Sequence, residues 1–143
     1  MTMIDDVITG IAKKLRTVCE CKIYKNNVPQ GMEEPCFFIN PVTPSCEQQL
    51  GTRERRIYPF DVVYMPKTER RDEIYSVSDK LMLALRIIDT EFAGKLRGRD
   101  MSFEVVDGVL HFMVRYDFSI YQKQTPDNPM EILNVKGELV NER

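Results

Sequence analysis

The stretch that decides the fold runs from residue 107 to residue 121 and reads Asp-Gly-Val-Leu-His-Phe-Met-Val-Arg-Tyr-Asp-Phe-Ser-Ile-Tyr. Large apolar side chains occupy every second position, which is the period of a β-strand. One face of this strand is therefore expected to be core, and the other is expected to meet water or a partner. The core face comprises Leu110, Phe112, Val114, Tyr116, Phe118 and Ile120, and the other face carries His111, Arg115, Asp117 and Ser119.

A tight turn precedes this strand. Asp107-Gly108 is a dipeptide favoured in two-residue hairpin turns, because both central positions need positive φ angles. Met101 to Val106 supplies the other arm of the hairpin. The folded part of the chain is therefore expected to end in a β-hairpin.

The rest of the chain predicts further elements around this hairpin. Apolar residues recur at helical spacing over residues 3–18 and 72–88, and Thr2 with Asp5 forms a capping box before the first helix. Apolar or alternating runs predict strands at 22–25, 35–40 and 53–65, with a turn region at 26–34, a long loop at 41–52 and a second irregular segment at 90–99.

These elements predict an α+β fold in a single domain, residues 1–123. Its antiparallel sheet has about five strands, with two helices packed on one face, in the order α-β-β-β-α-β-β. Residues 124–143 are expected to form a C-terminal extension. This segment is either a short helix lying on its own domain or a tail that docks on a neighbouring subunit.

The composition narrows the class of protein. The chain has 143 residues and a net charge of −2, which gives no general attraction to nucleic acid. No apolar run approaches the roughly 20 residues that span a bilayer, and the N-terminus lacks the pattern of a secretory signal. We therefore expect a protein that folds in a cytoplasm and has no membrane partner.

No catalytic or metal-binding constellation stands out. His111 is the single histidine and lies in a predicted strand, so it is expected to be a surface or interface residue. The spacing of Cys19, Cys21, Cys36 and Cys46 lacks paired Cys-x-x-Cys motifs, so free structural thiols are expected. We predict no catalytic residues, no metal and no cofactor, and hence a protein that is not an enzyme.

Arginines and a semi-apolar tail are the features that favour contacts with other proteins. Arg53, Arg55 and Arg56 follow the long 41–52 loop, which is longer than two strands need for their connection. Arginine is enriched in protein interfaces, although phosphate contacts to nucleic acid remain an alternative for these clusters. The candidate interface residues are Arg53, Arg55, Arg56, Arg115, Met130, Ile132 and Leu133.

Several segments, in their order along the chain, resemble the tail terminator family of phages and prophages of Gram-positive bacteria. None of them is a catalytic signature, and the likeness rests on their joint order and spacing. It extends over nearly the whole chain. The segments are Ile11–Leu15, Gln30–Ile39, Arg56–Val62, Leu96–Gly98, Val106–Phe112 and Asp127–Glu131.

The resemblance implies a virion structural protein, assembled in the bacterial host cytoplasm, that forms a homo-oligomeric ring, expected to be a hexamer. The ring would sit on the head-proximal end of the tail tube, stop tube polymerisation and join the tail to the neck. Its implied partners are the tail tube protein, the neck or connector protein and, where the tail has one, the sheath protein, with DNA only passing through the lumen. A neck component, a small nucleic-acid-binding adaptor and a small enzyme are the alternatives.

Overall fold

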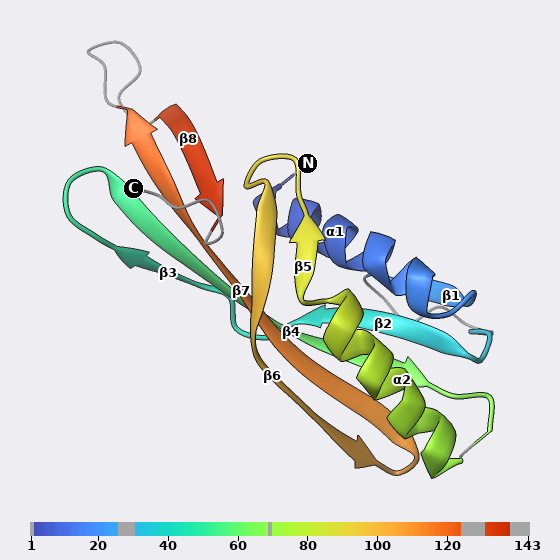
Figure 1. The fold of residues 1–143 in the computed structure, drawn as a ribbon. Coiled ribbons are helices and arrows are strands. Elements are labelled where there is room, and N and C mark those ends of the chain that lie inside the picture. The colour runs from blue at the N-terminus through green and yellow to red at the C-terminus, as the bar shows by residue number, and fades with distance from the viewer. Residues whose placement is uncertain (1, 26–30, 69, 124–130, 138–143) are drawn as a thin grey trace.

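The computed structural model describes residues 2–25, 31–68, 70–123 and 131–137, and the side chains of these as far as Tyr121. Two helices, α1 (Met3–Val18) and α2 (Arg71–Ala84), accompany a single curved sheet (Figure 1). The strands are β1 (Lys22–Tyr24), β2 (Cys36–Pro41), β3 (Ser45–Gln48), β4 (Arg53–Met65), β5 (Ile87–Asp89), β6 (Lys95–Val106), β7 (Val109–Lys123) and β8 (Glu131–Gly137).

Strands β4 and β7 form the centre of the sheet. They pair antiparallel from Arg53 opposite Tyr121 to Tyr64 opposite Leu110, which is the longest ladder in the structure. Around this pair the strand order is β1-β2-β4-β7-β6-β5, while β3 adds to β4 and β8 adds to β7. The predicted hairpin at Asp107-Gly108 is confirmed, because β6 and β7 pair up to Val106 and Val109, and both turn residues have positive φ.

Both helices pack on one face of the sheet, as predicted. The alternating residues of β7 that were assigned to the core are buried there, together with the apolar stripe of α2. From β4, the residues that face the same core are Tyr58, Phe60, Val62 and Tyr64. A smaller cluster of Cys36, Phe38 and Val63 lies apart from this core.

The predicted sheet is wrong in two respects. It is mixed rather than antiparallel, because β1 pairs with β2 in parallel. It also has more strands than predicted, since β3, β5 and β8 join the sheet. The α+β class and the number of helices are confirmed.

Strand β5 replaces the last turn of the predicted second helix. The hydroxyl of Tyr116 donates a 2.6 Å hydrogen bond to the carbonyl oxygen of Leu85, immediately after α2 ends at Ala84. Ile88 is fully buried, as the helical stripe suggested, but it lies in a strand opposite Leu96. A buried apolar residue satisfies either pattern, so pairing with β6 decides the structure.

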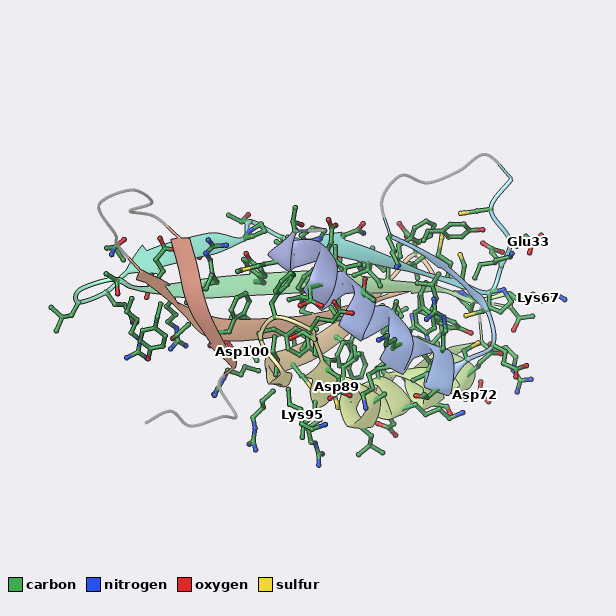
Figure 2. All side chains as sticks on the ribbon, turned by 90° about the horizontal axis from the view of Figure 1, so that it is seen from above. Glu33, Lys67, Asp72, Asp89, Lys95 and Asp100 are labelled. Carbon is green, nitrogen blue, oxygen red and sulfur yellow. The ribbon has the colours of Figure 1, made fainter. Side chains whose placement is uncertain are left out.

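The segment 90–99, predicted to be irregular, is a short turn followed by the start of β6. The Thr90 hydroxyl bonds the carbonyl oxygen of Gly94, and β6 begins at Lys95. Lys95 Nζ lies 2.7 Å from Asp89 Oδ1 at the turn end of the β5–β6 ribbon (Figure 2). Gly98 lies so close to the backbone of Leu85 that a Cβ there would stand 2.6 Å from the Leu85 oxygen.

Asp6 fastens the N-terminal helix to this turn. Its side chain is buried, and its two carboxylate oxygens accept hydrogen bonds from the backbone N–H groups of Glu91 (2.9 Å) and Phe92 (2.8 Å). The sequence indicates only a favourable charge near the N-terminus of a helix. The structure shows instead a contact between residues 85 positions apart.

We predict that Asp6→Ala lowers the free energy of unfolding by about 2 to 3 kcal/mol, because two N–H groups lose a charged acceptor. Urea denaturation would measure the change. Asp6→Asn keeps one oxygen acceptor, so its free energy of unfolding should fall by less. Equal denaturation midpoints for Asp6→Ala and the native protein would show that the contact contributes nothing to stability.

Candidate functional site

The β3–β4 hairpin lies at the end of the sheet away from the helices (Figure 1). Residues 41–52, predicted to be a loop, contain β3, which pairs with β4 from Ser45 opposite Ile57 to Gln48 opposite Glu54. The hairpin and the paired ends of β7 and β8 extend beyond the part of the sheet that the helices cover (Figure 1). The loop prediction is therefore wrong, because the segment pairs with the chain that follows it.

The tip of this hairpin carries an exposed leucine. Leu50 is 95% exposed, the highest value among the large apolar residues of the described chain. Gly51 beside it has a φ of 69°, a conformation that favours glycine and turns the chain back into β4. A fully exposed leucine gains nothing in the folded monomer, so it is a candidate contact to another protein.

The three arginines of β4 already have partners within their own chain. Arg53 Nη2 donates to Ser119 Oγ at 3.3 Å, and its guanidinium lies 5.6 Å from the centre of the Tyr121 ring. Arg56 bonds the hydroxyl of Tyr58 at 2.8 Å and pairs with Glu54 at 3.4 Å. These side chains therefore have partners in the monomer, and the predicted contact to another chain stays a prediction.

Asp117 is a buried carboxylate between two arginines on the face of the sheet opposite the helices. Its side chain is fully buried, and its two oxygens lie 2.7 Å from Arg55 Nη2 and 3.1 Å from Arg115 Nε. Arg115 also pairs with Asp100, a residue at positive φ where β6 shifts register. A buried charge needs such partners, so Arg55 and Arg115 stabilise the fold.

His111 lies in a pocket further along the same face. Its Nδ1 is 3.0 Å from Asp61 Oδ2, and both residues are partly exposed. The pocket has a volume of about 430 Å³ and is lined by Asp61, Ser102, Phe103, Glu104, Val106, His111 and Met113.

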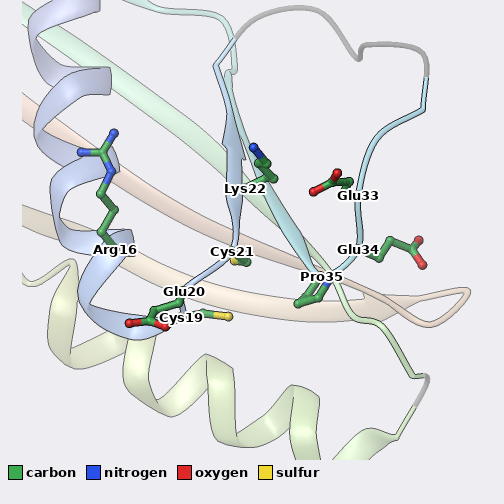
Figure 3. Close-up of a pocket in the computed structure, with 8 residues that line it drawn as sticks. All are labelled: Arg16, Cys19, Glu20, Cys21, Lys22, Glu33, Glu34 and Pro35. Carbon is green, nitrogen blue, oxygen red and sulfur yellow. The ribbon is translucent and has the colours of Figure 1, made fainter.

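A second pocket, of about 510 Å³, lies where α1 ends and β1 begins (Figure 3). Cys19 and Cys21 both line it, together with the segment that leads into β2. Burial, aided by a hydrogen bond with Cys19, raises the pKa of Cys21 to about 12, so the reactive thiolate is scarce at neutral pH. Within the described residues, no group of three or more His, Cys, Asp or Glu side chains could hold a metal ion.

The comparison with known families decides the class of protein. A family model described as phage tail terminator protein matches residues 6–128, which is most of the chain. The chain belongs to the phage tail terminator protein family. No curated protein matches the chain in sequence.

The family makes this chain a structural component of a phage tail, which confirms the resemblance at the level of the family. The family is a structural one and not a family of enzymes. In the part of the chain that the structure describes, no helix is long and apolar enough to cross a membrane.

The predicted interface residues of this tail protein lie mostly at one end of the sheet. Arg53, Arg55 and Arg56 are in β4 beside the hairpin, and the paired end of β7 lies next to them. Ile132 and Leu133 fall in β8, whose backbone pairs with β7, so the helix alternative for this segment is wrong, while docking on a neighbouring subunit stays a prediction. Met130 lies outside the described residues.

Sequence reasoning missed the two residues that define this end of the sheet. The sequence places Leu50 in the predicted 41–52 loop and Asp117 on the strand face expected to meet water or a partner. Asp117 lies two positions after Arg115 in the predicted strand, which indicates that the two side chains share the outward face. Its other partner, Arg55, could be found only by knowing how β4 and β7 pair.

We predict that Arg55→Ala lowers the free energy of unfolding by about 1 to 3 kcal/mol, because buried Asp117 loses its closest cation. Arg53→Ala is the matched control, since Arg53 has no buried acid as partner among the described contacts and should change stability by less than about 1 kcal/mol. Urea midpoints of the two variants would be compared. The same midpoint for both would contradict the role given to Arg55.

Proposed function

We propose that this chain forms a ring on the head-proximal end of the phage tail tube, stops tube polymerisation and joins the tail to the neck. Membership of the tail terminator family supports this proposal. The role needs a protein with surfaces for its own copies and for the tube, and the exposed tip of the β3–β4 hairpin is one such surface. The proposed ring is hexameric, and DNA passes through its lumen.

The hairpin tip is the proposed contact to the tube or to an adjacent subunit. The observation that carries this assignment is the nearly complete exposure of Leu50 at the end of the hairpin. Water-exposed leucines of this kind contribute free energy only when another surface covers them, at about 25 cal/mol per Å² of buried apolar area. The tip therefore has the chemistry of a docking residue.

Arg115 can take part in such a contact without leaving its own partners. A guanidinium has five N–H donors, and Arg115 uses Nε for Asp117 and Nη1 for Asp100. Its side chain is 33% exposed, so it can also reach a carboxylate of another chain. Arg115 would then both hold Asp117 and contact the partner.

A capping assay tests the proposed function. Purified tube protein would be polymerised alone and with this chain, and tube lengths measured by electron microscopy. We expect short tubes of limited length with this protein bound at one end. Tubes of unchanged length without bound protein would contradict the proposal.

We predict that Leu50→Lys raises the protein concentration needed to cap tubes at least tenfold, because a charged side chain replaces the apolar contact. The stability should change by less than about 0.5 kcal/mol, as is usual for exposed positions. Leu83→Lys is the matched control, since Leu83 is 68% exposed but lies on α2. Equal capping by both variants would exclude the hairpin tip as the contact.

A further inference from the structure

The sheet has two open edges on opposite sides. Strand β3 pairs only with β4, and the part of β6 beyond its short ladder with β5 pairs only with β7, within the described residues. Between these edges lie β4 and β7 (Figure 1). An open edge presents unpaired backbone N–H and C=O groups and is a template for another strand.

Hydrogen bonding in each hairpin fixes which residues present these groups. The Gln49 N–H donates to the Arg53 oxygen, so alternation along the antiparallel ladder directs the backbone groups of Cys46 and Gln48 outward. The two-residue turn after Val106 sets the alternation in β6, and there Phe103 and Val105 are directed outward.

The faces of the two edges also agree. Cys46 pairs with Arg56, and Arg56 pairs with the core residue Phe118. Because paired residues share a face of the sheet, the side chain of Cys46 is on the helix side. Phe103 and Val105 pack against the same core and are on the helix side as well. The outward-directed residues of the two edges can therefore pair with the helices of both copies on the same side of the joined sheet.

Neither edge is blocked by a proline or a lysine. All four residues of β3 are exposed, and the sequence Ser-Cys-Glu-Gln has no proline, lysine or bulge. The regular part of β6, Ser102–Val106, likewise has no proline or lysine, and the register shift precedes it. Natural edge strands are commonly blocked by such features.

Exposed apolar residues border both edges. Val42 and Leu50 lie before and after β3, and Val106 is the last residue of β6. Tyr75 of α2 contacts the ring of Phe103 with 6.3 Å between ring centres. Of the six large apolar residues that are exposed in the described part of the chain, four thus lie beside the two edges, which favours their burial by another strand.

We propose that β3 of one copy pairs with Ser102–Val106 of β6 in the next copy, so that one sheet continues from subunit to subunit. The inference rests on the proposed ring and names its subunit contact. Because β3 and β6 are different surfaces, the contact is head-to-tail and can close into a ring.

The strand directions are consistent with a ring. Each successive pair from β3 through β4 and β7 to β6 is antiparallel, so β6 runs opposite to β3. Rotation about a ring axis preserves the direction of each strand along that axis. Neighbouring copies would therefore join β3 and β6 antiparallel, with Cys46 opposite Val105 or Phe103.

Disulfide cross-linking tests this contact. Val105→Cys and Phe103→Cys would each be made in the full chain, mixed with tube protein and oxidised with copper phenanthroline after capping. Cys46 is native and exposed, so it serves as the second thiol. We expect one of the two variants to give dimers and higher oligomers on a non-reducing gel, and adding Cys46→Ser should abolish them.

Glu104→Cys is the matched control, because Glu104 lies on the opposite face of β6 and should give no cross-link to Cys46. Tubes that are capped normally while neither Val105→Cys nor Phe103→Cys cross-links through Cys46 would overturn the β3–β6 contact and leave the proposed function standing. If the native protein fails to cap tubes, the proposed function itself fails, and this inference fails with it.

Discussion

The ladder between β4 and β7 is the constraint on which the rest of the structure depends. Its register, from Arg53 opposite Tyr121 to Tyr64 opposite Leu110, sorts the side chains of both strands onto two faces. One face gives the core that α1 and α2 cover. Because both strands continue past the helices, the same ladder also carries β3 and β8, which extend the sheet where no helix packs.

The opposite face shows how charge and assembly are connected. Strand pairing places the acid of Asp117 between Arg55 and Arg115, and its burial makes these arginines necessary to the fold. Arginines at this end therefore cannot be interpreted as binding residues alone. Leu50 differs from them, because its side chain is exposed and stabilises nothing within the monomer. A variant of Leu50 consequently separates binding from stability, whereas a variant of Arg55 changes both.

The sequence was sufficient for the parts of the fold that local patterns determine. Alternation in β7, the Asp107-Gly108 turn and the capping box at Thr2 were all predicted, and all are present. Long-range contacts decided the rest. The apolar pattern around Ile88 is compatible with a helix, and only the pairing of Ile88 with Leu96 of β6 makes this segment a strand. Residues Ser45–Gln48 are all exposed in β3, so they lack the apolar alternation that would have predicted a strand. Likewise, Asp6 and Asp117 acquired their partners only through folding.

We propose that this member of the tail terminator family closes the tube as a ring of identical chains. Cryo-electron microscopy of the head-proximal end of assembled tails tests it most directly. We expect one closed ring of this chain directly above the last ring of tube protein, with the β3–β4 hairpin in contact with another chain. Density for this chain at the distal tip, or an open arrangement of copies that does not close, would contradict it.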